Sequence, residues 1–487
     1  MLFNSFQFLL FFPIVTLLYF LLPYQFRWFH LLVASCVFYM AFVPIYILIL
    51  FFTIIIDYVA GILIENAAGS RRRLYLLMSI IANVGILVFF KYYNFLSVNI
   101  NEVFHFVHVQ AAIPLLNIVL PIGLSFHTFQ AMSYTIEVYR SNQKPERHFG
   151  IYALYVMFYP QLVAGPIERP QNLLHQFHEP HPFNYDDFVV GMRRILWGLF
   201  KKAVIADRLS LIVAPIYKDP QHCSGMATVI GTVFFAFQIY CDFSGYSDIA
   251  LGTARVMGFK LMVNFNKPYN AKSISEFWRK WHISLSSWLS DYVFNSMAVS
   301  LRNYGLAAVV ISALVTFLVS GFWHGAAWKY IVWGALHGIA IAYELLTRKS
   351  RKKLFKKIPD TIGRIISVVL TFSYVCFTYI FFRANNVHDA VVMVKKVPGI
   401  FPEIAGIARH SHTLAQLLGG ISVSSVLVGF GYILFLELVH KLEGKENITE
   451  VVAAKSKVVR WSLYFLVAGT VYLFGIFNSH QFIYFQF

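Results

Sequence analysis

Charged side chains are scarce in this chain, and their scarcity excludes an ordinary soluble protein. Only 13% of the 487 residues are Asp, Glu, Lys or Arg, against about 25% in a typical soluble domain. Apolar residues make up 58% and aromatic residues 18%, including 49 Phe and 28 Tyr. This composition is typical of a polytopic membrane protein, because its helices face lipid and its aromatic rings gather at the membrane surfaces.

Cysteine is also rare, and the motifs of several enzyme classes are missing. Cys36, Cys223, Cys241 and Cys376 form no CxxC pair, so we expect small packed residues and no catalytic thiol. The motifs HExxH and GxSxG and a glycine-rich phosphate loop are absent. Their absence argues against zinc protease, serine hydrolase and nucleotide chemistry, and we expect neither a bound metal nor a bound cofactor.

Acidic residues are outnumbered, with 23 Asp and Glu against 40 Lys and Arg, for a net charge of +17. In a soluble protein this excess would suggest a nucleic-acid partner. Here the basic residues cluster in short loops between apolar runs, as the positive-inside rule requires, so the expected partner is the lipid bilayer and not nucleic acid. The apolar N-terminal stretch lacks a basic n-region and an A-x-A cleavage site, which predicts a retained first span.

Long apolar runs are plentiful, and together they predict an all-α, polytopic helical bundle of about 11–13 membrane segments. Three segments are ambiguous: 118–138 and 189–214 could cross the membrane, whereas 151–166 is short and broken by prolines, which favours a re-entrant element. We treat residues 1–487 as one membrane domain. Ten runs of about 20 residues predict clear spans: 3–22, 28–45, 47–65, 74–93, 227–247, 306–323, 328–346, 362–382, 418–439 and 459–478.

Counting the crossings gives an orientation. If the three arginines at 71–73 are cytoplasmic after three crossings, the N-terminus lies outside the cytoplasm. If the segments 118–138 and 189–214 both cross, four further loops also lie in the cytoplasm: 139–148, 260–302, 348–357 and 440–457. The C-terminal stretch then ends outside. No internal repeat is evident, so an inverted-repeat transporter has no support.

One aromatic segment, "ISEFWRKWHISLSSWLSDYVF" at 274–294, predicts an amphipathic helix that lies at the interface or is wedged against the bundle. His282 lies at the edge of its apolar face. Two readings of His282 stay open, a packed ring bonded to backbone and a functional group. The apolar members recur at steps of three and four: Ile274, Phe277, Trp278, Trp281, Leu285, Trp288, Leu289 and Tyr292.

A second histidine, His324, lies in the apolar stretch "SGFWHGAAW" at 320–328. Gly321 and Gly325 bracket it and predict a close helix approach or a broken turn. A neutral imidazole held away from water could remove a proton from a hydroxyl group during acyl transfer. A structural histidine is the alternative, and a further histidine, His337, follows in "WGALHG".

An ionisable residue inside a membrane span is costly, so we treat each one in this chain as a candidate functional residue. Asp242 and Asp248 lie in or beside a predicted span at 238–252, where they either serve function or cap a broken helix. Asp57 and His127 occupy two further apolar runs. None of these residues has the spacing of metal ligands.

Seven ordered motifs give the chain a strong resemblance to the membrane-bound O-acyltransferase family, and within it to the bacterial branch of alginate O-acetyltransferase membrane subunits. The opening "MLFNSFQFLLFF" and the closing "FIYFQF" also resemble that branch. The motifs are "LPIGLSFHTFQAMSYTIEVYR" (120–140), "FYPQLVAGPIERP" (158–170), "GLFKKAVIADRLS" (198–210), "QIYCDFSGYSDIALG" (238–252), "NFNKPYNAKSISEFWRKWHISLSSWLSDYVF" (264–294), "SGFWHGAAWKYIVWGALHG" (320–338) and "YIFFRANN" (379–386).

The resemblance implies a fold and a reaction. The fold is a ring of helices around a thinned core with a transmembrane tunnel, with a catalytic core at about 118–346 and C-terminal helices at 362–478. The reaction takes an acetyl group from a cytoplasmic thioester, such as acetyl-CoA, to an extracytoplasmic polysaccharide such as alginate or a cell-wall glycan. The family also implies an extracytoplasmic acetyltransferase or esterase-like partner protein and a place in the bacterial inner membrane.

The resemblance also assigns residues. It maps the catalytic base onto His324 and its polar partner onto His282. Trp278, Trp281 and Trp323 then wall the tunnel together with Ser286 and Asp291, and Asp242, Asp248 and His127 are possible supporting residues. One departure concerns 290–305, which reads "SDYVFNSMAVSLRNYG" where alginate-type members have a stretch similar to "RDYLYIPLGG", so the acceptor stays open between alginate and another exported or cell-wall glycan.

Two other functions are compatible with the same sequence. A transporter or channel for an acyl or glycan intermediate would use the tunnel without chemistry, and the carboxylates Asp57, Asp242 and Asp248 motivate it. A scaffold for partner proteins would need neither histidine. Substitution of His324 separates both alternatives from an enzyme.

Overall fold

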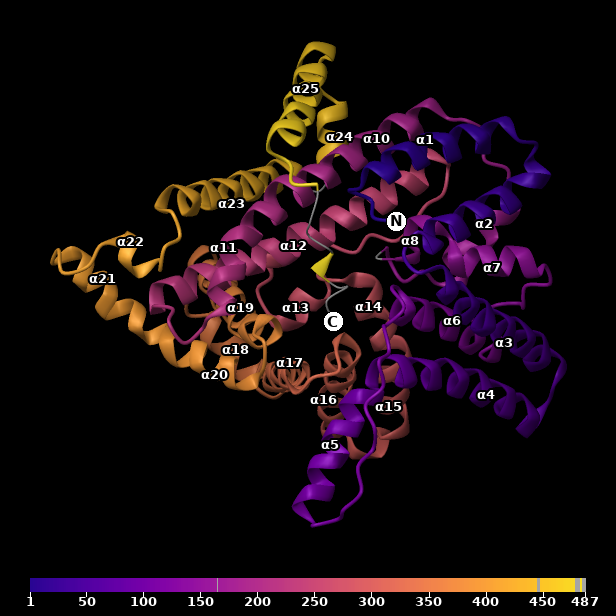
Figure 1. Cartoon of the computed structure of the whole chain (residues 1–487), viewed down its shortest axis with the longest axis horizontal. Helices are drawn as coiled ribbons and strands as arrows, with labels where there is room; N and C mark the ends of the chain where they lie inside the picture. The colour runs from indigo at the N-terminus through magenta and orange to yellow at the C-terminus, as the bar shows by residue number, and fades with distance from the viewer. Residues whose placement is uncertain (164, 445–446, 478–481, 484–487) are drawn as a thin grey trace. The chain divides into compact units, whose positions relative to one another are not determined.

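The structure is a computed structural model that describes residues 1–163, 165–444, 447–477 and 482–483. The described residues form helices joined by loops, with no strand among them, so the all-α prediction is confirmed (Figure 1). Seven helices are long and apolar enough to cross a bilayer, or eight if a bent pair counts as one span. The chain is a polytopic helical membrane protein.

The helix lengths support fewer full spans than the 11–13 segments predicted. Seven of the ten clear runs fall in the seven long apolar helices, and 328–346 belongs to the bent pair. The runs at 3–22 and 28–45 form helices of only 16 and 17 residues, whereas a full span needs about 20. The ambiguous segment 151–166 is indeed short and broken, because Phe158 separates two short, buried helices.

The chain divides into two compact units. The first contains residues 1–196 and 246–263, and the second contains residues 197–245 and 264–487. The chain changes unit inside α10 (Tyr185–Leu199), inside α12 (Gly225–Val256) and after Val263.

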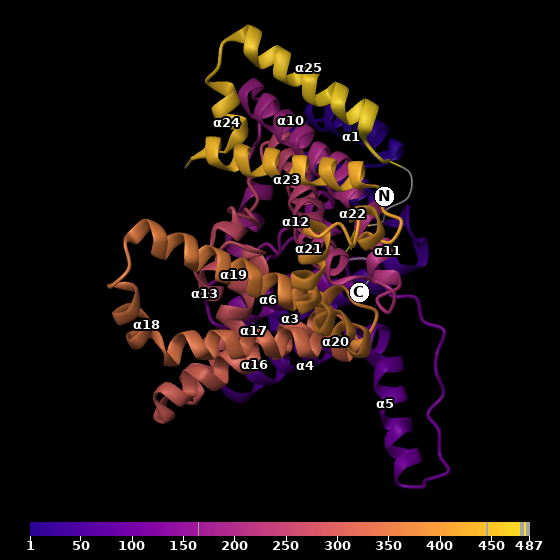
Figure 2. The ribbon, with the colours of Figure 1, turned by 90° about the vertical axis from the view of Figure 1, so that its left-hand side faces the viewer.

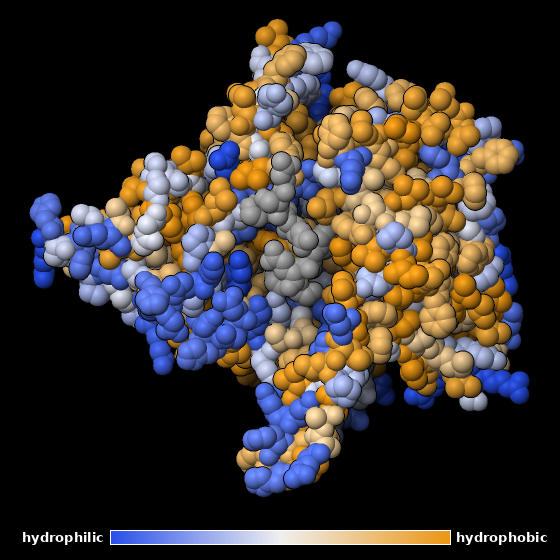
Figure 3. Space-filling model, viewed as in Figure 1, coloured by the Kyte–Doolittle hydropathy of each residue, from blue (hydrophilic) through white to orange (hydrophobic). Residues whose placement is uncertain are grey.

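In the first unit, α3, α4 and α6 pack against one another (Figure 1). Large apolar side chains are exposed on its helices, for example Phe6 at 73% and Leu48 at 61%. They form a broad hydrophobic surface (Figure 3), as expected of faces that contact lipid. The helices of this unit are α1 (Phe6–Leu21), α2 (Tyr24–Met40), α3 (Ile47–Asn66), α4 (Gly69–Leu87), α5 (Tyr93–Phe106), α6 (Leu124–Tyr139), α7 (Phe149–Met157), α8 (Tyr159–Leu162) and α9 (Pro170–Leu173).

In the second unit, α16 and α17 form a helical hairpin, and α18 bends by 69° from α17 (Figure 2). The closing stretch "FIYFQF" lies, except for Phe482 and Ile483, outside the described residues. The helices wholly within this unit are α11 (Asp207–Lys218), α13 (Ile274–Trp278), α14 (Ile283–Leu289), α15 (Asn295–Ser300), α16 (Leu306–His324), α17 (Trp328–Leu346), α18 (Arg348–Phe355), α19 (Asp360–Arg383), α20 (Val387–Lys396), α21 (Ile400–Ala408), α22 (Leu414–Leu417), α23 (Val423–Glu443), α24 (Ile448–Ala453) and α25 (Lys457–Phe474).

Candidate active site

The segment 274–294 is not one helix, so that prediction is wrong. It consists of α13, α14 and a π-helical turn at Ser290–Phe294. Asn264 causes the break, because its carbonyl oxygen accepts from the Ile283 N–H at 2.9 Å and its Oδ1 accepts from the Ser284 hydroxyl at 2.7 Å. These two bonds hold the start of α14.

His282 lies at this break in a strained conformation. Its φ of 44° and ψ of 55° are left-handed, which costs a non-glycine residue about 1–2 kcal/mol. Such residues concentrate at functional sites, where the surrounding structure holds them. The ring is fully buried, and burial lowers the pKa of His282 to about 3. His282 is therefore a neutral imidazole at neutral pH.

The apolar face predicted for this segment is confirmed. All the predicted members except Tyr292, which is half-buried, are buried, so the segment is packed inside the protein. Ser286 is half-buried, and Asp291 is exposed on the π-helical turn.

His324 is the last residue of α16, and the backbone around it is both tight and broken, as the glycines predict. A Cβ atom on Gly321 would lie 2.3 Å from the Tyr330 carbonyl oxygen, so only glycine permits this approach of α16 and α17. The helix α16 ends at His324, and the next helix, α17, begins at Trp328. The His324 ring therefore lies at the negative end of the α16 dipole, which favours a ring that accepts a proton.

An aromatic cage surrounds His324, which is only 4% exposed. The ring centroids of Trp323, Trp333 and Phe382 lie 4.9, 4.9 and 5.3 Å from that of His324. Trp323 also lies 6.1 Å from the His282 ring. The two predicted catalytic histidines thus pack on one shared indole.

His337 completes the cluster, and sequence reasoning did not include it among the site residues. Trp278 Nε1–H donates to His337 Nδ1 at 3.2 Å, and His337 Nε2 lies 3.0 Å from Thr378 Oγ1. Because Nδ1 accepts, Nε2 carries the proton and donates to Thr378, whose hydroxyl donates to the Val375 carbonyl at 2.8 Å. Both nitrogens of His337 are engaged, so it positions Trp278, and the sequence signal for it was only "WGALHG".

Trp281, the remaining tryptophan of the predicted tunnel wall, belongs to a neighbouring aromatic stack. Its ring stacks on Phe277 with centroids 5.6 Å apart, and it lies 6.0 Å from Tyr379. Trp278 contacts both Trp333 and Phe317, at 5.7 and 5.2 Å. Trp278 is therefore the tryptophan that links the cage of His324 to the cavity described next.

A cavity of about 540 Å³ lies beside this cluster. This volume is within the range of small-ligand sites. The α16 residues Ala313, Thr316, Phe317 and Ser320 line it, and His324 follows Ser320 by one turn on the same face. The Ser320 hydroxyl is fully buried and has no hydrogen-bond partner in the described part of the chain. The remaining lining residues are Ser275, Trp278, Arg279, Ile283, Ser286, Ser287, Leu289, Ser290, Phe294 and Ile341.

Asp242 is paired with a buried lysine that it shares with Asp207. Lys202 Nζ lies 2.5 Å from Asp242 Oδ1 and 2.9 Å from Asp207 Oδ1, and all three side chains are buried. The other oxygen of Asp242 accepts from the Ile483 N–H at 2.8 Å. Asp242 precedes Phe243 in the chain, whose ring lies 4.6 Å from that of His282, and its supporting role stays a prediction.

The other two supporting candidates, Asp248 and His127, belong to the first unit. Asp248 accepts from Arg194 Nε at 2.9 Å. His127 Nε2 lies 2.5 Å from Thr53 Oγ1. The alternative that Asp242 and Asp248 cap a broken helix is wrong, because α12 runs unbroken from Gly225 to Val256.

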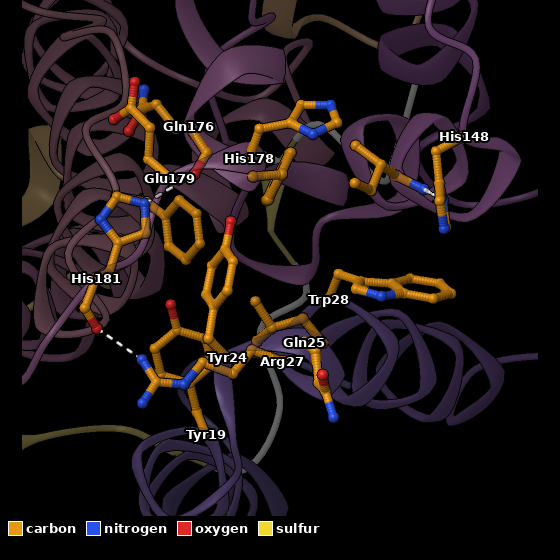
Figure 4. Close-up of a pocket in the computed structure, with 14 residues that line it drawn as sticks. Tyr19, Tyr24, Gln25, Arg27, Trp28, His148, Gln176, His178, Glu179 and His181 are labelled. Carbon is orange, nitrogen blue, oxygen red and sulfur yellow. Dashed lines mark hydrogen bonds between the residues drawn. The ribbon is translucent and has the colours of Figure 1, made fainter.

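The first unit has a second pocket of about 250 Å³, shown in Figure 4. Its polar side chains largely hold loops together. Arg27 donates to the carbonyl oxygens of His181 and Leu22 at 2.7 and 3.1 Å, and His181 Nε2 donates to the Gln176 carbonyl at 2.8 Å. His148 caps α7 by accepting from the Ile151 N–H at 3.2 Å. We therefore place the candidate active site at the histidine cluster. Within the described residues no group of three or more His, Cys, Asp or Glu could hold a metal ion.

The sequence was compared with known proteins. The model of the membrane-bound O-acyltransferase family matches residues 74–383. The Probable alginate O-acetylase of Pseudomonas aeruginosa is 37% identical over 396 residues, which are 80% of this chain and 73% of that protein. The Peptidoglycan O-acetyltransferase of Helicobacter pylori is 32% identical over 399 residues, 76% and 73% of the two chains. The Teichoic acid D-alanyltransferase of Bacillus subtilis is 27% identical over 300 residues, 58% and 73% of the two chains.

Proposed function

The chain belongs to the membrane-bound O-acyltransferase family, and from that membership we propose that it moves an acetyl group from a cytoplasmic thioester to a hydroxyl group of an extracytoplasmic polysaccharide. The relatives named for alginate and for peptidoglycan support an acetyl group and a glycan acceptor. The acceptor receives the group directly or through an extracytoplasmic partner protein. The donor is acetyl-CoA or another acyl thioester.

We assign the general base to His324. Its ring takes the proton of the acceptor hydroxyl, the hydroxyl oxygen attacks the thioester carbonyl, and the carbon–sulfur bond breaks. The leaving thiolate then takes the proton from the ring. His282, held neutral by burial, orients Trp323, and the tryptophans around the site exclude water that would otherwise hydrolyse the thioester.

The cavity beside α16 is the place we assign to the arm of the donor. Its lining is rich in hydroxyl groups and carries one guanidinium, Arg279, which suits a flexible polar arm with a phosphate. The Ser320 hydroxyl is available to donate to a carbonyl oxygen of that arm. Phe317 and Trp278 stand between the cavity and the cage of His324, so they must move when the thioester reaches His324.

The observation that carries this proposal is the placement of His324, which ends α16 inside an aromatic cage one turn beyond a hydroxyl-lined cavity. The test is His324→Ala in membranes, with labelled acetyl-CoA and the exported glycan of the host as acceptor. Loss of a general base lowers the rate on the order of a hundredfold to ten-thousandfold.

The matched control is His222→Ala, because His222 is in the same unit but exposed. This variant should transfer acetyl groups at the rate of the unmodified chain. Near-normal transfer by a folded His324→Ala variant would remove His324 from the mechanism.

Transport without chemistry is the alternative, and the charges of the second unit give it little support, because Asp242 is already paired with Lys202. Purified protein in liposomes distinguishes the two functions. An enzyme transfers labelled acetyl groups while small solutes stay enclosed, whereas a channel releases the solutes and transfers nothing.

A further inference from the structure

A buried polar cluster lies between α3, α4 and α6 of the first unit, apart from the residues of the proposed reaction. Its centre is Asp57 on α3, which is fully buried, as are Ser79 on α4 and Thr135 on α6. Ser79 Oγ lies 2.6 Å from Asp57 Oδ1. Asn83 Nδ2 donates to both carboxyl oxygens at 2.9 Å. Every partner of Asp57 is thus neutral.

No positive charge balances Asp57. Within the described residues no Lys, Arg or His side chain forms an ion pair with it. The titratable side chains close enough to interact with its charge are two phenols, Tyr134 on α6 and Tyr152 on α7. An ionised carboxylate without a cation is very costly in a lipid-embedded bundle, and such a group is normally neutralised.

A proton on Asp57 would also let every contact of the cluster be a hydrogen bond at the same time. Three oxygen–oxygen contacts follow one another, from Asp57 Oδ1 to Ser79 Oγ at 2.6 Å, from Ser79 Oγ to Thr135 Oγ1 at 3.1 Å, and from Thr135 Oγ1 to the Met132 carbonyl at 3.2 Å. Each contact needs one proton, and the two hydroxyl groups supply only two. A proton on the Asp57 carboxyl supplies the third and saturates the chain, with each group donating toward Met132.

We propose that Asp57 is an intramembrane proton-binding site, in which the carboxylic acid donates to Ser79 and Ser79 donates to Thr135. The site extends along α3 to Thr53, one turn away, which contacts His127. His127 Nδ1 and the Tyr152 hydroxyl are buried without a partner in the described part of the chain. The site does not depend on acyl transfer.

The direct test is infrared spectroscopy of the purified full-length chain in lipid vesicles at neutral pH. The spectrum of the unmodified chain minus that of the Asp57→Asn variant should show the carbonyl band of a protonated carboxylic acid, and this band should shift in D₂O. Glu168 is a second buried carboxyl, and burial raises its pKa to about 7, but it is present in both proteins and cancels in the difference. Asp248→Asn is the matched control, because Asp248 is paired with Arg194 and should contribute no such band.

Stability supplies the second measurement. Asparagine adds no charge and keeps two hydrogen bonds of the neutral acid, since its NH2 group can donate to Ser79 and its single oxygen can accept from Asn83, so Asp57→Asn should stay folded and unfold at or slightly below the temperature of the unmodified chain. A carboxylate band at neutral pH in place of the acid band would overturn the proposal. A band that responds to Na⁺ or K⁺ at constant pH would also overturn it, since it would assign the site to a metal cation.

Discussion

Lys202 lies between two buried carboxylates, and its loss should destabilise the second unit. In Lys202→Met, Asp207 and Asp242 would remain in the interior without this cation. Removing one partner of a buried ion pair costs about 3–5 kcal/mol. We expect a clear fall in the unfolding temperature of the purified protein, measured by thermal unfolding in detergent.

Two variants test this explanation. Lys352→Met removes an exposed lysine from the same unit and should leave the unfolding temperature unchanged. Lys202→Met combined with Asp242→Asn removes one of the two stranded charges and should recover part of the loss. An unfolding temperature of Lys202→Met equal to that of the unmodified chain would contradict the role assigned to this lysine.

At the scale of single residues, the sequence predicted candidates better than it predicted their partners. His324 and His282 were selected from apolar motifs and a family resemblance, and the structure packs both on Trp323. His337 was noted but not selected. Its importance depends on Trp278 and Thr378, which are 59 and 41 residues away in the chain, and no local pattern indicates such a contact.

Among the helices, the hairpin of α16 and α17 is the element that sets the position of His324. In Gly321→Ala the new Cβ atom would lie 2.3 Å from the Tyr330 carbonyl oxygen and 3.2 Å from the Gly334 Cα atom. Backbone atoms cannot yield as a flexible side chain does, so the two helices must separate. Overpacking of this kind costs about 1–3 kcal/mol, and we expect a lower unfolding temperature together with slower acetyl transfer.

Gly431→Ala is the control for this helix–helix contact. Gly431 lies within α23 with no atom near its missing Cβ, so alanine there should be neutral or slightly stabilising, since it has the higher helix propensity. If Gly321→Ala were as stable and as active as Gly431→Ala, the close approach of α16 and α17 would not be what holds His324.

The segment 274–294 also shows that apolar periodicity does not predict where a helix breaks. The apolar spacing of 274–294 correctly identified the buried face, but it predicted one helix where the structure has two and a π-helical turn. The reason is Asn264, outside the segment, whose two bonds to Ile283 and Ser284 determine the break. Tertiary hydrogen bonds thus override the single helix that the apolar spacing predicts.

On the scale of the whole chain, composition was sufficient for the class of protein. A chain with few charges and many apolar runs had to be a polytopic membrane protein, and the helices confirm it. The division into two units was not predictable, because the chain changes unit inside α10, near its end, and inside α12. No loop, proline or composition change marks either position, since a continuous helix can contribute its two ends to different packing units.

The distribution of charge over the whole chain predicts its orientation in the membrane. The helix α18 contains five Lys and Arg, four of them exposed, and it bends by 69° from α17, so the positive-inside rule places it in the cytoplasm. The stretch after α21 then lies outside, because α19 returns the chain across the membrane.

Lys353→Cys should therefore react with a membrane-impermeant maleimide only after spheroplasts are permeabilised, whereas Arg409→Cys should react in intact spheroplasts. Both variants are made in a background with the four native cysteines replaced. The reverse pattern would invert the orientation, and with it the direction in which the acetyl group is proposed to move.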